Sequence, residues 1–202
     1  IIVIIVIIVI IVIIVIIVII VIIVIIVINI LIVFSINIVV IGWNLKGPQI
    51  VRTLREDPAH AHTPILVMAD LDHTPVDDPL LAFTRAPLPV RGAAMERACL
   101  HAAATVVVLA NYAEKHHADA LTAVNCLMAR QQAPQARVIA ELLDPSQRTY
   151  VEAAGADLIV GMGEVGGFLL AEATIGNEQA RQLLAYVAHA RQTGALAPGA
   201  GR

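Results

Sequence analysis

The residues with the clearest chemical potential form a turn after the β-branched run at 38–41, where Gly42, Trp43 and Asn44 precede an apolar helix pattern. In a dinucleotide-binding fold, the first glycine makes the tight turn, the second admits the pyrophosphate and the third lets the helix pack on the strand. Gly42 and Gly47 fill the first and third places, whereas Asn44 stands at the second. The helix start still favours an anion, but the Asn44 side chain disfavours NAD in its usual pose.

Two carboxylates accompany apolar runs further along the chain. Asp70 follows the run at 65–69, where a carboxylate binds a ribose hydroxyl in many dinucleotide folds, although it comes 28 residues after Gly42 rather than about 20. The loop at 57–64 accounts for the additional length. The alternative for Asp70 is a solvated acid at a strand end. Glu141 lies within another apolar run. Two alternatives stay open for its side chain: it faces the crevice at the top of the sheet, or it is a surface charge.

Residue patterns for catalysis are sparse. The two serines, Ser35 and Ser146, lie outside any nucleophile-elbow pattern, which argues against Ser-His-Asp hydrolysis. Two close pairs occur among the seven histidines, His60 with His62 and His116 with His117. Neither pair has a cysteine or paired carboxylate at metal-ligand spacing. We therefore expect no catalytic residues, no enzyme activity and no metal site.

Short β-branched runs alternate with amphipathic stretches from residue 37 onward, which predicts an α/β fold with a doubly wound parallel sheet. The expected strands are 38–41, 65–69, 88–90, 105–109, 138–142 and 158–160. The expected helices are 48–56, 94–103, 119–129, 145–154 and 164–174. Three prolines in the segment 72–87 predict a loop with one short turn.

Helical spacing assigns apolar faces to two of these helices. The predicted core-facing residues are Ile50, Val51 and Leu54 in the first helix, and Leu121, Val124 and Met128 in the third. Pro48 suits a first helical position, and Gly155 suits a left-handed helix end.

An Ile-Ile-Val repeat over residues 1–28 distorts the overall composition of 59% hydrophobic and 14% charged residues. No charged residue precedes Lys46, so the remaining positions have an ordinary charge content, and we expect one globular domain there. The repeat is long enough to span a bilayer, and the cations after it would put the carboxyl side in the cytoplasm. Its period of three fits neither helix nor strand. A membrane-spanning segment, an artefact and a designed segment all stay open.

The division that we expect is a low-complexity apolar Ile/Val segment at 1–36, a domain at 37–176 and a C-terminal helix with a mobile tail at 177–202. The net charge of −3 and the few aromatic residues argue against a nucleic-acid partner. Cys99 and Cys126 lie in apolar helical patterns, which predicts buried thiols in a reducing compartment.

Four segments in fixed order resemble the RCK (TrkA-N) regulatory domain of prokaryotic potassium channels, including the branch similar to the Castor and Pollux ion channels. They are Ile-Val-Val-Ile-Gly-Trp-Asn at 38–44, Ile-Leu-Val-Met-Ala-Asp at 65–70, Arg-Val-Ile-Ala-Glu-Leu-Leu-Asp-Pro at 137–145, and Ala-Ala-Gly-Ala-Asp at 153–157 with Gly-Glu-Val-Gly-Gly-Phe-Leu-Leu-Ala at 163–171. The resemblance covers about residues 37–176 and implies a Rossmann-like RCK N-lobe.

The resemblance implies a ligand-sensing gating domain at the cytoplasmic face of the cell membrane. It implies a homo-oligomer, as a dimer or ring, and a channel pore subunit or membrane domain as partner. The ligand would be an ion or a nucleotide. By position, the crevice would be lined by Gly42, Trp43, Asn44, Asp70, Arg91, Gly92, Asn111 and Glu141.

Two departures from the family pattern predict that no divalent metal binds in this crevice. Ala93 follows Gly92 where many relatives have Gly-Asp, and Leu143 replaces the second acid of a Glu-x-Glu pair that begins at Glu141. The sequence also contains no potassium-filter motif. Two alternatives to a regulatory domain stay open: a soluble NAD(P)-dependent oxidoreductase fragment, and an oligomerisation scaffold without ligand.

Overall fold

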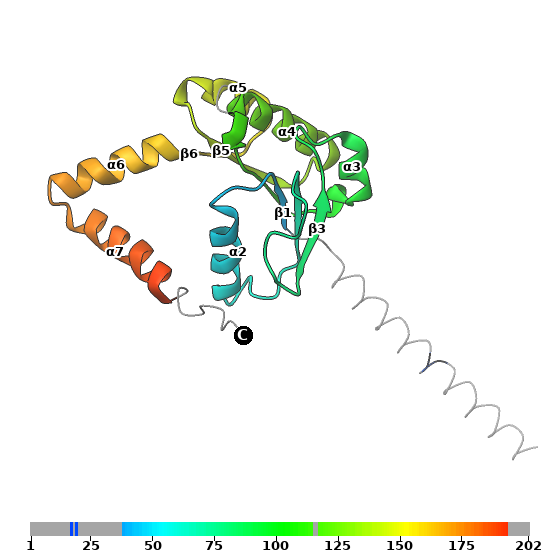
Figure 1. The fold of residues 1–202 in the computed structure, drawn as a ribbon, viewed down its shortest axis with the longest axis horizontal. Coiled ribbons are helices and arrows are strands. Elements are labelled where there is room, and N and C mark those ends of the chain that lie inside the picture. The colour runs from blue at the N-terminus through cyan, green and yellow to red at the C-terminus, as the bar shows by residue number, and fades with distance from the viewer. Residues whose placement is uncertain (1–16, 18, 20–37, 115–116, 194–202) are drawn as a thin grey trace, which may run out of the picture. The chain divides into compact units, whose positions relative to one another are not determined.

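Six strands, each parallel to its neighbours, form the centre of the fold in the computed structural model (Figure 1). They are β1 (Ile38–Ile41), β2 (Ile65–Ala69), β3 (Leu81–Arg85), β4 (Thr105–Val108), β5 (Arg137–Leu142) and β6 (Leu158–Gly161). The order across the sheet is β3-β2-β1-β4-β5-β6. The order reverses between β1 and β4, so the expected doubly wound, Rossmann-like sheet is confirmed.

The structure describes residues 17, 19, 38–114 and 117–193. Contacts divide the chain into the units Ile1–Ser35 and Ile36–Arg202, and the second unit contains every element named below. Almost all of the Ile-Val segment and the tail after residue 193 lie outside the described residues, so the predictions made for them are not tested. The domain boundaries also stay a prediction. In the described part of the chain, no helix combines the length and the apolar character that crossing a membrane requires.

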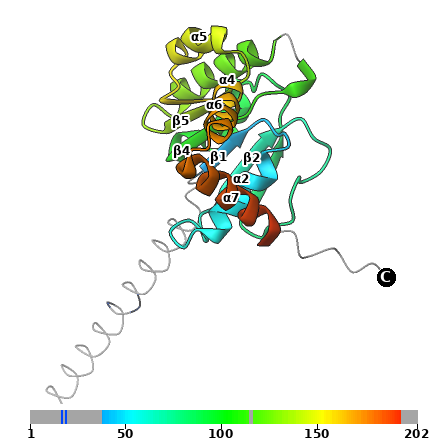
Figure 2. The same cartoon turned by 90° about the vertical axis from the view of Figure 1, so that its left-hand side faces the viewer.

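Helices follow the strands in the order that the sequence predicts. They are α2 (Gly47–Glu56), α3 (Gly92–Arg97), α4 (Ala118–Gln132), α5 (Arg148–Ala153), α6 (Met162–Thr174) and α7 (Glu178–Thr193). Short 3-10 turns are η1 (Leu100–Ala102), η2 (Tyr112–Glu114) and η3 (Pro145–Gln147). In both views α6 runs on from the end of β6 and the chain then turns into α7 (Figure 1, Figure 2).

The core has two parts, one on each face of the sheet. On one face, Met95 of α3, Cys126 of α4 and Val151 of α5 pack with Val39 of β1. On the other face, α2 packs its predicted residues over β1 and β2, with Val51 fully buried and Ile50 and Leu54 beside it. Strands that are buried on both faces need apolar residues at successive positions, which explains the uninterrupted β-branched runs.

The prediction of a third strand at 88–90 is wrong. The strand is β3, which lies within the segment 72–87 that was predicted as a loop. Because β3 is the edge strand, only part of each side chain is buried, and its sequence lacks the apolar run that marks the inner strands. The residues at 88–90 instead lead into α3, and the backbone N–H of Val90 donates to the side chain of Asn125 at 2.9 Å.

The predicted core-facing stripe of α4 is confirmed at Met128, which packs against the core, and is wrong at Val124. Val124 is 42% exposed, while Ala118, Thr122, Cys126 and Ala129 are buried. These buried residues are small and follow one another at intervals of four or three, so they share one face of the helix. Small side chains let α4 pack close to the sheet, and the larger apolar residues are left on its flanks.

The two cysteines differ in their surroundings. Cys126 is buried as predicted, and burial raises the pKa of its thiol to about 12. Cys99 is exposed, so the prediction of a buried thiol is wrong there. Its backbone has a φ of 52°, and the helix predicted over 94–103 ends at Arg97 before this left-handed residue.

Helix α2 begins where Trp43 packs against Gly47. A Cβ atom at Gly47 would lie 2.6 Å from the Trp43 ring, a distance at which one of the two must move. Pro48 occupies the first turn of α2 as predicted. The close approach of ring and backbone therefore fixes the angle at which the chain enters the helix.

We expect Gly47→Ala to lower the free energy of unfolding by about 1–3 kcal/mol, because the added methyl group collides with the indole ring. Thermal unfolding followed by circular dichroism measures the change. Gly166→Ala in α6 is the matched control, because no atom lies within 4 Å of a Cβ placed there. The control should be neutral or slightly stabilising, and equal losses in both variants would contradict the prediction.

Candidate functional site

The candidate site lies at the carboxyl end of the sheet, where the strand order reverses, and it centres on Glu141 of β5. The Glu141 side chain is only 4% exposed. Three segments converge on it: β5 itself, the turn after β1 and the segment after β4. At the start of α4, Asp119 accepts hydrogen bonds from the backbone of Leu143 at 2.9 Å and Asp144 at 2.8 Å, which fixes the end of β5.

Four donors surround the Glu141 carboxylate. Its Oε2 atom accepts from Asn44 Nδ2 at 2.8 Å and from the backbone N–H of Ala110 at 3.0 Å. Its Oε1 atom accepts from the Tyr112 hydroxyl at 2.7 Å and forms an ion pair with Lys46 Nζ at 2.6 Å. Lys46 Nζ also contacts the Tyr112 hydroxyl. The carboxylate is therefore bonded on both oxygens, as a buried charge must be.

The charges at this cluster stabilise one another. Burial alone would raise the pKa of Glu141, but the hydrogen bonds from Lys46, Tyr112, Asn44 and Ala110 outweigh it and hold the pKa below its usual value. Burial lowers the pKa of Lys46, and its contacts with Glu141 and Tyr112 more than offset this, so the net shift is upward. Lys46 and Glu141 are therefore both ionised at neutral pH.

The Asn44 side chain points into this cluster and leaves the start of α2 with few free donors. Asn44 Oδ1 accepts from the backbone N–H of Lys46 at 2.9 Å, and the Asn44 carbonyl accepts from Gly47 N–H at 3.0 Å. Pro48 has no N–H to offer. The N–H groups of Lys46 and Gly47 are therefore already engaged and Pro48 has none, so this helix start offers a pyrophosphate fewer donors than a dinucleotide fold does.

Gly42 is required by the same turn. Its φ is +82°, and a Cβ atom there would lie 2.7 Å from the carbonyl oxygen of Leu109. Any other residue would be strained in this conformation and would collide with the backbone after β4. Gly42 and Trp43 thus shape the turn that places Asn44 against Glu141.

Asp70 and Asn111 belong to a neighbouring cavity of about 410 Å³, which also contains His117. Asp70 is exposed at the end of β2, and Arg85 Nε lies 3.2 Å from its Oδ1 atom. Asn111 Oδ1 accepts from the backbone N–H of Ala113 at 3.1 Å. The cavity therefore presents a carboxylate, an amide and an imidazole within a space suited to a small molecule.

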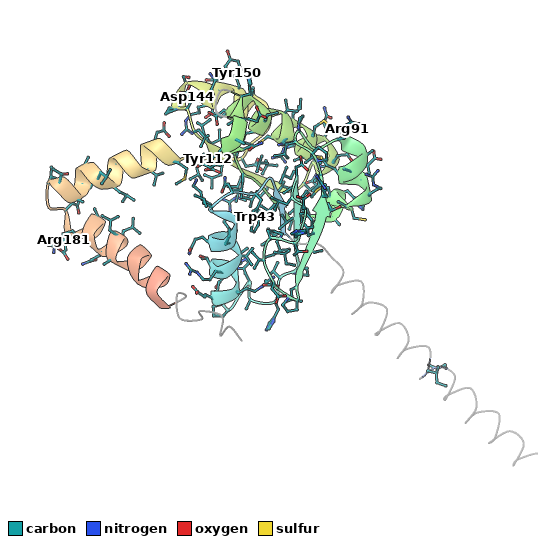
Figure 3. The ribbon with its side chains drawn as sticks, viewed as in Figure 1. Trp43, Arg91, Tyr112, Asp144, Tyr150 and Arg181 are labelled. Atoms are coloured by element: carbon teal, nitrogen blue, oxygen red, sulfur yellow. The ribbon has the colours of Figure 1, made fainter. Side chains whose placement is uncertain are left out.

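Arg91 and Gly92 do not join either group. Arg91 lines a separate cavity of about 400 Å³ with Arg85 and Arg97, and Figure 3 shows Arg91 beside α3, well away from Tyr112. Gly92 packs against α4, because a Cβ atom there would lie 3.1 Å from the Met128 methyl group. Of the eight candidate residues, only Asn44 and Glu141 are in direct contact through their side chains.

Sequence reasoning missed Lys46 and Tyr112. Tyr112 is only partly exposed, and burial followed by its bond to Glu141 raises the pKa of its hydroxyl. One signal for Lys46 was available in the sequence, since a buried acid such as Glu141 needs a cation nearby. No comparable signal marked Tyr112, because its turn after β4 has no regular pattern.

An apolar groove of about 780 Å³ runs along the sheet face from the Lys46–Glu141 pair. Its floor is formed by β4, β5 and β6 through residues such as Val107, Ile139 and Val160, and α2 forms one wall. Helix α6 contributes only its first residue, Met162, to the lining. Among the residues that the structure describes, no group of three or more histidine, cysteine or acidic side chains is placed to hold a metal ion.

The TrkA-N domain family matches residues 38–162 of the chain. No curated protein matches the chain in sequence. Solved structures with the same fold include GsuK bound to ADP (TM-score 0.53, 17% identity, covering 64% of this chain) and the GsuK channel bound to NAD (TM-score 0.55, 19% identity, covering 71%). Another is the TrkA-N domain of the inner membrane protein ybaL from Escherichia coli (TM-score 0.53, 16% identity, covering 69%).

The extent of these matches differs. This chain spans 32% and 24% of the two GsuK chains but 97% of the ybaL domain. At these identities the structural similarity shows the fold alone. The residues that the TrkA-N family matches include β1, the turn with Asn44 and β5 with Glu141.

We expect Glu141→Gln to lower the free energy of unfolding by about 2 kcal/mol at neutral pH, because Lys46 loses a charged partner. The lowered pKa of Glu141 means that the folded state releases this proton more readily than the unfolded chain. The difference in free energy of unfolding between the parent chain and Glu141→Gln is therefore largest above the ordinary glutamate pKa of about 4.3, and it shrinks as pH falls through the folded-state pKa.

Thermal unfolding at several pH values measures this difference. Glu96→Gln on the exposed surface of α3 is the control and should match the parent chain throughout. A difference that is unchanged or grows on acidification would contradict the role of the ionised Glu141 carboxylate.

Proposed function

Because the chain belongs to the TrkA-N domain family, we propose that it is a ligand-sensing regulatory domain of a potassium channel or potassium transport system. The observation that supports this function best is the Glu141 cluster, which joins segments from β1, β4 and β5 at the reversal of the sheet. A ligand that changes these contacts would shift the three segments together, as a two-state switch requires. The domain would act at the cytoplasmic face of the membrane, with a pore subunit as partner.

We propose that the ligand is a nucleotide whose sugar and base occupy the cavity of about 410 Å³ beside Asp70. The Asp70 carboxylate is placed to accept from ribose hydroxyls, and the Asn111 amide faces the same cavity. GsuK, which has the same fold, binds ADP in one solved structure and NAD in another. Because the start of α2 is already bonded, the phosphates would lie away from it, in contrast to the usual NAD pose.

The oxidoreductase alternative has little support from the geometry. The polar groups of the crevice, Asn44, Lys46 and Tyr112, are engaged with Glu141 rather than free to exchange a proton with a substrate. We therefore propose that the domain is not an enzyme. The affiliation with the Castor and Pollux branch stays a prediction.

We further propose that the domain forms a homo-oligomer through the apolar groove and α6. Helix α6 starts at Met162 directly after the last residue of β6, so no loop lets it fold back over the sheet. Phe168 is 64% exposed and Leu170 is 70% exposed on this helix. Each copy supplies both a groove and an apolar helix, and a reciprocal exchange between two copies covers both.

We expect ADP or NAD to raise the melting temperature of the chain, because a ligand that binds only the folded state stabilises it. Asp70→Asn should weaken binding about tenfold by removing charge from the ribose contact. Isothermal titration calorimetry measures nucleotide binding by the parent chain and by Asp70→Asn. Asp77→Asn, at an exposed position, is the control and should bind like the parent chain. Unchanged melting with every nucleotide tested would instead favour a scaffold without ligand.

We expect Phe168→Glu to shift the chain from oligomer to monomer, because a carboxylate cannot be buried unpaired in an apolar groove. Sedimentation equilibrium measures the mass. Thr53→Glu on the exposed face of α2 introduces the same charge outside the groove and should leave the mass unchanged. A parent chain that is monomeric at all concentrations would overturn the proposed association.

A further inference from the structure

Lys46 differs from the other three partners of Glu141 in how it is held. Asn44 and the backbone of Ala110 belong to packed segments, and Asn44 is held from both ends of its side chain, by Ala110 O at 2.9 Å and by a backbone N–H at 2.9 Å, whereas Tyr112 is 41% exposed and has a short, rigid side chain. The Lys46 side chain is 32% exposed and reaches the carboxylate through a flexible four-carbon stem. The carboxylate site is thus preformed, and the ammonium group covers it from the solvent side.

The surroundings of the Lys46 ammonium group are those of an ammonium-binding site. Glu141 Oε1 lies 2.6 Å from Nζ, and the centroid of the Tyr112 ring lies 4.6 Å from it. A carboxylate together with a phenol hydroxyl can hold an organic ammonium ion through its charge and its N–H groups. The Tyr112 hydroxyl adds a third contact to the same nitrogen.

The site also has an approach route that does not depend on Lys46. Both Lys46 and Glu141 line the apolar groove of about 780 Å³, whose floor includes Val107 and Ile139. A short alkyl chain attached to an ammonium group could lie along this floor while its nitrogen occupies the position of Nζ. The hydrocarbon stem of Lys46 takes this place in the present chain.

We propose that Glu141 and Tyr112 form a binding site for a primary organic ammonium ion, and that Lys46 fills this site as a tethered counter-ion. The chain thereby carries its own cation at the crevice and needs no free cation to hold β1, β4 and β5 together. A ligand that acts at this crevice then has to carry an anionic group, because it must attract the Lys46 ammonium group away from Glu141. This inference stands apart from the proposed function, because it holds whether or not a nucleotide binds.

Chemical rescue tests the proposal. Lys46→Ala removes the three methylene groups and the ammonium nitrogen that together correspond to propylammonium. We expect this variant of the full chain to melt about 5 °C below the parent, because a buried carboxylate loses its cation. Propylammonium chloride should restore at least half of that loss in a saturable manner, as ligand binding to the folded state does.

Three controls separate site binding from general effects. Tetramethylammonium chloride at equal ionic strength and neutral propanol should not rescue Lys46→Ala, since the first cannot donate a hydrogen bond and the second has no charge. Propylammonium should not change the melting of the parent chain, where the site is filled. The double variant Lys46→Ala/Glu141→Gln should show no rescue, because the carboxylate is gone.

The outcomes decide the proposal without reference to nucleotide binding. Rescue by propylammonium alone, abolished by Glu141→Gln, supports it. Equal rescue by tetramethylammonium, rescue that survives Glu141→Gln, or a Lys46→Ala variant that melts like the parent overturns it. If Lys46→Ala does not fold alone, folding that returns only with propylammonium is the supporting result, and its failure to return overturns the proposal. Lys46→Met, which keeps most of the stem, should then fold but show no rescue.

Discussion

The ionised carboxylate of Glu141 is the constraint on which the crevice depends, because a charge buried within a parallel sheet is stable only when donors surround it. Asn44, Lys46, Tyr112 and the backbone of Ala110 supply those donors. They come from the turns after β1 and β4, so satisfying one side chain of β5 also fixes both turns. The same requirement explains why asparagine stands where a dinucleotide fold has its second glycine.

The two faces of the sheet are covered unequally, and the connections between elements explain why. Helices α3, α4 and α5 contribute residues to the core on one face, and small residues let α4 lie close to the strands. On the other face, α2 packs over β1 and β2, whereas the groove runs over β4, β5 and β6. Because α6 follows β6 without a loop, it does not cover this region, and its apolar side chains are left exposed. The proposed association of copies would cover the groove and the apolar side chains of α6 together.

These features together favour regulation over catalysis in a TrkA-N domain. The polar groups at the reversal of the sheet hold one another, so the ligand proposed for the adjoining cavity beside Asp70 would act by competing for existing contacts. Among the partners of Glu141, solvent reaches Lys46 and Tyr112, at 32% and 41% exposed, and of these Lys46 carries the charge that an anionic group would attract. The position that binds pyrophosphate in other dinucleotide folds is here part of the framework.

The sequence by itself determined the inner strands, because runs that are buried on both faces of a parallel sheet must be apolar throughout. It also determined the turn at Gly42 and singled out Asn44 and Glu141 as separate candidates. It could not identify β3, since this partly buried edge strand has no continuous apolar run, in contrast to the Leu-Ile-Val of the other edge strand, β6. Nor could it identify the small-residue face of α4. Only the tertiary structure decided that Asn44 and Glu141, which are 97 residues apart, form a hydrogen bond with each other, and that Lys46 and Tyr112 also contact Glu141. The physical reason is that the strand order brings these segments together, and no local pattern of residues encodes that order.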